Sequence, residues 1–314
     1  MYKIYKTSRG KLFNPETPVE DSWIDISAPN DDDLNDLIKH FEIPEEAMTS
    51  VKDHQEVPKV EEVDDFQFIL VQTPYDPGES SPGYMVKPLG ILYNKEHVIT
   101  LTDSSNDVIT YMKSKLKNFD RNKIINTSQK QQLILKMLLF VSKIFLSYLK
   151  DMNQSILKAQ EEMIKNPDNK DIIKLMEIEK SLTYFNRALN SNYLIIQKIA
   201  KRKSFNMTED DEELVQDVID ECKQALETTK IYEHIVTDTA SGFATIVSNN
   251  LNLSVRFLTS ITIILMLPTL VASVYGMNVK LPYMDDPLAF DYLMLIMILT
   301  VIIVAIWFYR KRIL

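Results

Sequence analysis

The spacing of hydrophobic and polar residues changes twice along the chain, and each change predicts a different kind of structure. Up to about residue 126, short runs of β-branched and aromatic residues alternate with polar segments suited to turns. One stretch, Asp31–Phe41, has acids in its first turn and predicts a helix. We therefore predict a mixed α/β domain over residues 1–126, with strands at Ser22–Ser27, Phe66–Tyr75, Pro88–Asn94 and His97–Asp103, the last two joined as a hairpin.

From about residue 128 the pattern becomes helical. Residues 128–202 contain no glycine and a single proline, Pro167, which marks a break between two helices. After the next turn there is no stop before Gly276. We therefore predict one helix over Glu209–Val274, roughly 100 Å long at about 1.5 Å per residue.

Along this long helix every third or fourth residue is apolar, small or uncharged, which is the spacing of a heptad seam. No small globular domain contains such a rod, so we expect the seam to pack against copies of the same chain. Several seam residues are small or polar, which favours a wide bundle with a wet axis. The helical region and stalk are assigned to residues 127–252, and the seam comprises Val215, Val218, Cys222, Ala225, Thr229, Tyr232, Val236, Thr239, Phe243, Ile246, Asn250 and Leu253.

Two uncharged apolar runs follow, Phe257–Tyr275 and Tyr292–Tyr309. Each is about the length, roughly 20 residues, that crosses the hydrocarbon core of a bilayer. A charge at the centre of such a helix costs about 2.5–3.5 kcal/mol on insertion scales, so two clean runs are informative. We predict transmembrane helices over residues 253–275 and 292–309, an outer loop over 276–291 and a tail over 310–314.

The basic residues next to these spans predict their orientation. Arg256 begins the first span, and Arg310, Lys311 and Arg312 follow the second. Because lysine and arginine favour the cytoplasmic side, both chain termini should lie in the cytoplasm, with the short loop outside. The sequence thus predicts a multi-pass protein of the cell membrane whose first 252 residues are cytoplasmic.

The first span carries a stripe of small and polar residues, whereas the second shows none. Such a stripe is typical of helix–helix contacts in membranes, and it is equally typical of a pore lining. It continues the heptad seam, which favours a pore on a common axis and places the second span outside, toward lipid. The stripe comprises Asn252, Thr259, Thr262, Met266, Thr269, Ser273 and Gly276.

Composition removes several classes of function. The net charge of −9 argues against nucleic acid as a partner, because phosphate binding requires a basic face. Six scattered glycines form no phosphate-binding loop, and the single cysteine and four scattered histidines form no catalytic motif. We therefore expect no enzyme activity. A membrane-anchored enzyme using the metal-binding potential of Asp53–Glu56 and a signalling receptor are the rival interpretations, and the short outer loop disfavours the receptor.

The motif Tyr275-Gly276-Met277-Asn278 directly follows the first of two terminal spans. Together with Val57–Val71 and Pro88–Asp103, it makes the chain resemble the CorA family of magnesium channels, in its two-span form with a Gly-Met-Asn motif. The resemblance implies an α+β cytoplasmic domain with a mixed sheet, a long helical stalk and two C-terminal transmembrane helices, assembled as a funnel-shaped homopentamer.

The resemblance also implies roles for individual residues. Asn278, with the backbone of Gly276, would form the outer selectivity ring of the Tyr275–Asn278 filter. Successive pore rings would follow toward the cytoplasm, although the heptad count places Thr259 on the axis beside Leu258, and that choice stays open. Thr262 and Ser273 join the lining from the stripe alone. The implied rings are Thr269, Met266, Leu258 and Asn252, and the implied basic collar is Arg256, Arg310, Lys311 and Arg312.

The predicted function is inward, channel-like transport of Mg²⁺ down its electrochemical gradient, without an organic cofactor. Mg²⁺ gives up its bound waters reluctantly, and a ring of neutral Asn278 carbonyl oxygens can accept hydrogen bonds from those waters. The resemblance implies closure by cytoplasmic Mg²⁺ at acidic sites between subunits, for which Asp65 and Asp217 are the candidate ligands. A Zn²⁺, Co²⁺ or Ni²⁺ transporter of the same architecture is the alternative.

Overall fold

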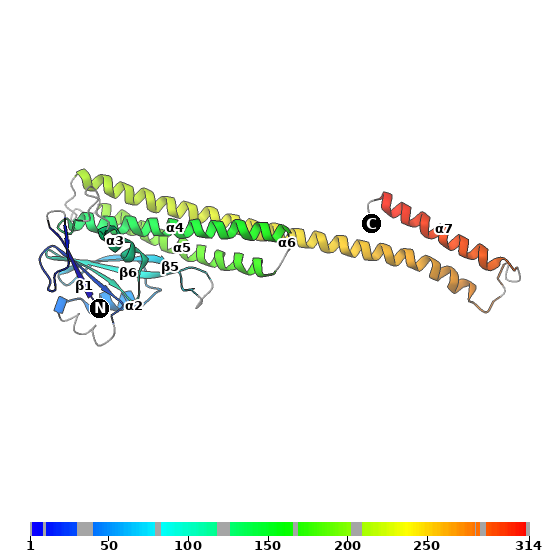
Figure 1. Ribbon diagram of the computed structural model, residues 1–314, viewed down its shortest axis with the longest axis horizontal. Coiled ribbons are helices and arrows are strands. Elements are labelled where there is room, and N and C mark those ends of the chain that lie inside the picture. The colour runs from blue at the N-terminus through cyan, green and yellow to red at the C-terminus, as the bar shows by residue number, and fades with distance from the viewer. Residues whose placement is uncertain are drawn as a thin grey trace. The chain divides into compact units, whose positions relative to one another are not determined.

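The computed structural model describes residues 2–8, 11–29, 40–78, 83–117, 126–165, 169–201, 209–279, 281–282 and 287–311. The chain divides into two compact units, Met1–Ala240 and Ser241–Leu314 (Figure 1). Nearly all of the predicted helix Asp31–Phe41, and the predicted break at Pro167, lie outside the described residues.

The described part of the first unit contains a seven-stranded mixed sheet in the order β2-β1-β3-β7-β6-β5-β4. The pair β3–β7 is parallel, and every other pair is antiparallel. Three strands were not predicted from the sequence, and they occupy both ends of the sheet. The strands are β1 (Tyr2–Ser8), β2 (Lys11–Phe13), β3 (Ser22–Ser27), β4 (Lys59–Val63), β5 (Phe66–Tyr75), β6 (Met85–Tyr93) and β7 (His97–Thr102).

The predicted strands and hairpin are confirmed, with three boundaries moved. β3 and β5 have the predicted bounds, whereas β6 begins three residues early, contains Pro88 and ends one residue early, and β7 also ends one residue early. Proline lacks the N–H that a central strand needs. Here β7 pairs with β6 only from Gly90 onward, so the side of Pro88 away from β5 carries no ladder.

Both faces of the sheet are covered, which explains why β5 is a nearly continuous apolar run rather than an alternating one. Phe68 and Leu70 point into a core with α2 (Glu45–Lys52). Gly90 permits that helix to approach closely, because a Cβ there would lie 2.7 Å from a methyl group of Val51. Helices α3 (Asp107–Lys117), α4 (Lys130–Lys165) and α5 (Asn169–Lys201) cover the opposite face (Figure 1).

Helix α6 (Glu209–Tyr275) begins and ends within one residue of the prediction, but the first half of its seam is not free to meet another copy. Val218, Cys222, Ala225 and Thr229 are at most 1% exposed within the single chain. Helices α4 and α5 contact this part of α6: Gln160 Nε2 donates to Thr239 Oγ1 at 2.7 Å, and Asn186 Nδ2 donates to Glu233 Oε2 at 2.9 Å. The expectation that the whole seam packs against copies of the chain is therefore wrong for residues 215–236.

The second unit contains the end of α6 and α7 (Ala289–Arg310). In the described residues three helices are long and apolar enough to cross a membrane: α4, α6 and α7. Half of the most apolar window of α4 is buried inside the protein, against 6% for α6 and 0% for α7. Helix α4 thus forms part of the core of the first unit, and the membrane candidates are the two predicted spans.

Candidate functional site

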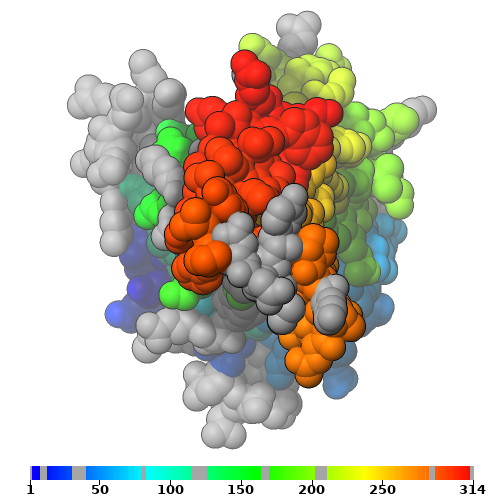
Figure 2. All heavy atoms as spheres, turned by 90° about the vertical axis from the view of Figure 1, so that its right-hand side faces the viewer, coloured from blue at the N-terminus to red at the C-terminus, as the bar shows by residue number. Residues whose placement is uncertain are grey.

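Within the second unit, the end of α6 has two unlike faces. Its least exposed side chains, at positions 260, 261, 264, 267, 268 and 271, recur at helical spacing on one side. Helix α7 has a matching stripe at 293, 297, 300, 304 and 308, and Figures 1 and 2 both place α7 alongside the second half of α6. We attribute the two covered stripes to each other.

The predicted pore stripe lies on the opposite, exposed face of α6. At about 100° per residue, the centre of Thr262, Met266, Thr269 and Ser273 lies about 170° from the centre of the covered face. All four side chains are exposed, as is Asn252. Leu258 and Thr259 are also exposed and flank the midline of this face on either side, so the choice between them stays open.

The hydroxyl groups of the exposed face are held by their own helix. Thr262 Oγ1 donates to the Leu258 carbonyl oxygen at 2.9 Å, and Thr269 Oγ1 donates to that of Leu265 at 3.0 Å. A hydroxyl group that donates its hydrogen bond in this way can still accept hydrogen bonds through its oxygen lone pairs. The exposed face therefore presents uncharged oxygen acceptors among apolar side chains, which suits the hydrogens of water more than a bare ion.

Ser260 was not predicted as a site residue, yet its position distinguishes the two faces of α6. It donates to the Arg256 carbonyl oxygen at 2.8 Å, as the threonines do, yet it is only 2% exposed. A small side chain on the covered face permits close approach of a neighbouring helix. Ser260 does not lie three or four residues from Thr262, as members of the stripe do, and this spacing could have indicated from the sequence that it lies on the other face.

Helix α6 ends at the Gly-Met-Asn motif. The Gly276 N–H donates to the Ala272 carbonyl oxygen at 2.9 Å, and the Met277 N–H donates to that of Val274 at 3.2 Å. Gly276 is the turn residue directly after the helix, and its φ is not positive. A Cβ at this position would lie 3.2 Å from the Ala272 oxygen, so the glycine relieves crowding at the helix end. Tyr275, Met277 and Asn278 are exposed.

The basic residues lie where the sequence places them relative to the helices. Arg256 is on α6 just before the apolar run, and Arg310 and Lys311 end α7. Lys311 Nζ lies 5.4 Å from the centre of the Trp307 ring, an arrangement of cation and aromatic ring found at membrane surfaces. Arg312 lies outside the described residues.

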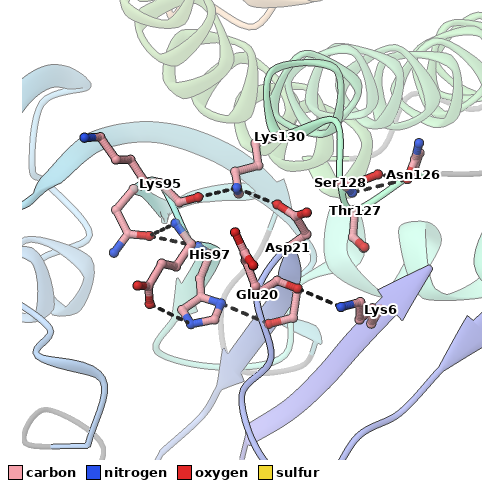
Figure 3. A network of polar contacts seen from close by, with 12 residues as sticks. Lys6, Glu20, Asp21, Lys95, His97, Asn126, Thr127, Ser128 and Lys130 are labelled. Atoms are coloured by element: carbon pink, nitrogen blue, oxygen red, sulfur yellow. Dashed lines mark hydrogen bonds and ion pairs between the residues drawn. The ribbon is translucent and has the colours of Figure 1, made fainter. Parts of the chain in front are cut away.

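The acidic candidates belong to the first unit and are both exposed. Asp65 lies in the turn between β4 and β5, beside a hollow of about 430 Å³ that Lys95 and Lys130 also line. The Lys130 ammonium is already engaged, donating to Asp21 Oδ1 at 2.7 Å and to the Lys95 carbonyl oxygen at 2.5 Å (Figure 3). Asp217 lies on α6. Across the part of the chain that the structure describes, no three acidic, histidine or cysteine side chains form a metal-binding group.

Known proteins resemble this chain over nearly its whole length. The cobalt/magnesium transport protein CorA of Methanocaldococcus jannaschii is 24% identical over 303 residues, which cover 92% of this chain and 89% of that protein. The protein of the same name from Thermotoga maritima is 21% identical over 301 residues, covering 93% and 83%. The solved structure of the complete CorA magnesium transporter from M. jannaschii matches with a TM-score of 0.84 at 22% identity, covering 99% of this chain and 98% of that one.

The structural match agrees with the predicted α+β domain, long helix and C-terminal apolar helices. The family model described as "CorA-like Mg2+ transporter protein" matches residues 21–311, which include strands β3 to β7, the long helices and both spans. This chain therefore belongs to the CorA-like Mg²⁺ transporter family.

Proposed function

We propose that this protein conducts hydrated Mg²⁺ inward across the cell membrane, as a homopentamer with both termini of each chain in the cytoplasm. The observation that supports this most is the exposed face of α6, opposite the face covered by α7. That face is free of charge from Phe257 onward, carries oxygen acceptors and ends at Asn278. Five copies with this face turned inward would enclose a polar path, with α7 between α6 and lipid.

The chemistry of the face fits an ion that keeps its water. Mg²⁺ dehydrates reluctantly, so a pore for it gains by accepting hydrogen bonds from the bound waters. The Asn278 amide oxygen and the Thr269 hydroxyl oxygen can do this without the tight hold of a carboxylate. Each charge gains about 2.3 kcal/mol per 100 mV on moving inward, so a divalent ion gains about 4.6 kcal/mol and needs no fuel.

The basic residues Arg256, Arg310, Lys311 and Arg312 would form a collar at the cytoplasmic mouth, in keeping with the preference of basic residues for that side. In the same proposal, Mg²⁺ bound between subunits by Asp65 and Asp217 holds the pore shut when cytoplasmic Mg²⁺ is plentiful. Their exposure supports this, because a ligand shared between two copies must be uncovered in one.

Mg²⁺ uptake into liposomes tests the transport proposal. Replacing Asn278→Ala removes one acceptor from every subunit, and we expect uptake to fall about tenfold or more, in line with the loss of about 1.5–3 kcal/mol for a hydrogen bond to a charged centre. Val279→Ala changes the next residue, which is also exposed, and should leave uptake within about twofold. Equal uptake by wild type and Asn278→Ala would contradict the filter assignment. Repeating the assay with Co²⁺ separates the ion alternatives.

The closure proposal has its own test. Asp217→Ala should weaken inhibition by Mg²⁺ loaded inside the liposomes, because a lost carboxylate ligand lowers the affinity of a hard cation. Asp238→Ala removes an equally exposed carboxylate from the same helix and serves as the control. Inhibition of the Asp217→Ala variant at the wild-type Mg²⁺ concentration would remove this residue from the proposal.

A further inference from the structure

Helix α5 has a surface that the rest of the first unit leaves uncovered. Its exposed side chains recur every three or four residues, on the side away from those that it buries. Among the described residues of this helix, every charged side chain in an exposed position is basic, whereas Glu177 and Glu179 are half-buried and Asp171 is buried. We call one row of this surface the basic face: Met176, Lys180, Arg187, Leu194, Lys198 and Lys201.

Two large apolar side chains lie in the same row as these cations. Met176 is 61% exposed and Leu194 is 58% exposed. Burial of such a side chain by a partner would contribute up to about 1.5–3 kcal/mol. The neighbouring cations restrict the choice of partner, because juxtaposed like charges oppose association and opposite charges favour it. The basic face therefore fits an acidic surface that also carries an apolar side chain.

Helix α6 has such a surface within the first unit. From residue 212 to residue 231 its exposed charged side chains are five acids and two lysines. Four of the acids share one side of the helix with Ile231, which is 56% exposed. At about 100° per residue, this side lies opposite the seam that α4 and α5 cover. We call it the acidic face: Glu213, Asp217, Asp220, Glu227 and Ile231.

The contacts that the acidic face makes within its own helix leave it able to meet a partner. Gln216 Nε2 donates to Asp220 Oδ1 at 2.9 Å, and Lys223 Nζ lies 3.8 Å from Glu227 Oε1. Exposed pairs of this kind, one turn apart on a helix, contribute only about 0.2–0.5 kcal/mol each. With 62% of its side chain exposed, Glu227 stays accessible to a lysine of another molecule.

We propose that the basic face of one copy docks on the acidic face of a second copy of this chain, with lysines of α5 meeting carboxylates of α6 and with Leu194 and Ile231 enclosed between them. This inference rests on the proposed homopentamer, and it names the surfaces that join neighbouring first units. The two faces are different surfaces of one chain, so each copy offers one face to each neighbour. Repetition of such a head-to-tail contact generates a ring.

Cross-linking of the full-length protein in detergent by a carbodiimide, which joins a carboxylate to an amine in direct contact, tests the docking. Two variants with different tags are co-expressed. The first keeps the acids and carries Lys180→Arg, Lys198→Arg and Lys223→Arg, the last because that amine lies beside Glu227. The second keeps these lysines and carries Asp220→Asn and Glu227→Gln. Peptide mass spectrometry should find amide bonds from Lys180 or Lys198 to Asp220 or Glu227, which no single chain can form.

Each variant expressed alone is the control, and it should yield none of these bonds. Raising the NaCl concentration from about 0.1 M to about 1 M shortens the Debye length from about 10 Å to about 3 Å. We therefore expect the yield of the cross-links to fall at least about threefold. Equal yields at the two salt concentrations would overturn the pairing of the two faces by charge.

Co-purification of the two tags measures assembly separately from docking. Both tags in one complex without these cross-links would overturn the docking of the two faces and leave the homopentamer standing. Tags that do not co-purify would contradict the homopentamer and the docking together. A basic helix face can also meet an anionic membrane. Protection of Lys180 and Lys198 from acetylation only in the presence of anionic liposomes, without cross-links, would assign the basic face to the membrane instead.

Discussion

The two units of this chain use the same side chains in opposite ways. In residues 1–240 most of the large apolar side chains that the structure describes are enclosed by the chain itself: Phe145 and Phe185 are 0% exposed and meet edge to face with their ring centres 4.9 Å apart. In residues 241–314, Phe290 is 72% exposed and Ile303 64% exposed. Burial of apolar area drives folding in water, so the first unit is stable by its own packing, whereas the second needs lipid and neighbouring helices.

Helix α6 contains both situations. Cys222 and Thr229 fill its seam inside the first unit, whereas Asn250 and Leu253 continue the same spacing in the second unit and are exposed. A three- and four-residue repeat reports that one side of a helix is covered, but not what covers it. The contrast explains why the repeat alone suggested a single self-associating rod.

The largest difference that we expect between the two units is the loss of stability when a phenyl ring is removed. Phe185→Ala leaves a cavity in a close-packed core, and we expect a loss of about 3–5 kcal/mol in the free energy of unfolding. Phe290→Ala removes the same ring from an exposed position on α7 and should change it by less than about 0.5 kcal/mol. Denaturant titration of the full-length protein in detergent, followed by circular dichroism, measures both. Similar losses for the two variants would mean that the units do not differ in this way.

The single cysteine tests how the seam is covered. Cys222 is 1% exposed, and burial raises the pKa of its thiol to about 11. At pH 8 only about one thiol in a thousand is then ionised, so alkylation of the native protein should be at least about 100-fold slower than in denaturant. Lys223→Cys in a Cys222→Ala background places the thiol on the exposed neighbouring position, with 58% of the lysine side chain exposed. Comparable native rates at the two positions would contradict a seam filled by α5.

Two threonines offer a matched test of the faces in the second unit. Thr269 on α6 and Thr300 on α7 both donate to the carbonyl oxygen four residues earlier, at 3.0 and 2.7 Å. Replacement by valine removes the hydroxyl and keeps the shape. Thr269→Val should lower Mg²⁺ uptake about fivefold, the effect of losing roughly 1 kcal/mol from an acceptor in the path, whereas Thr300→Val should leave it unchanged. A larger loss of uptake for Thr300→Val than for Thr269→Val would place the ion path on α7 instead of α6.

The sequence was sufficient for the elements whose period is long or whose composition is extreme. The bounds of β5, the whole of α6 and the two apolar spans follow from residues read without any structure. Strands β1 and β4 were missed because Lys3, Lys6, Glu61 and Glu62 interrupt them, as charges commonly do on strands near the edge of a sheet. Their identity depends on pairing with distant partners, such as Tyr2 with Ile26, which local pattern does not encode.

The candidate site divides in a similar way. The side of α6 on which Thr262 and Thr269 lie was predictable, because helical geometry fixes which residues share a face. The reason for a glycine at position 276 was not predictable, because it depends on how close a Cβ added there would lie to the Ala272 oxygen. The covering of Cys222 by α5 was equally beyond a local reading, because residues 189 and 222 are distant in the sequence.

The smallest effect that we expect concerns the pH dependence of the first unit at His97. This side chain is 15% exposed and its Nδ1 lies 3.1 Å from Ser22 Oγ, within the polar network around Lys130 (Figure 3). Burial lowers the pKa of the imidazole, and Lys130 lowers it further, while Glu96, Asp21 and Glu20 act in the opposite direction. The unfolded chain therefore takes up a proton at a higher pH than the folded one.

The sign of the effect follows. Stability from the neutral imidazole is fully present above the ordinary value of about 6.5 and is lost as the pH falls below it. His97→Gln should remove this acid-dependent loss, so that stability measured between pH 7 and pH 5 declines less steeply than in wild type, by up to about 1 kcal/mol over the range. His234→Gln removes a histidine from an exposed position of α6 and should keep the wild-type slope. A wild-type slope in His97→Gln would show that other groups carry the acid sensitivity of the first unit, and that its polar network tolerates a charged imidazole.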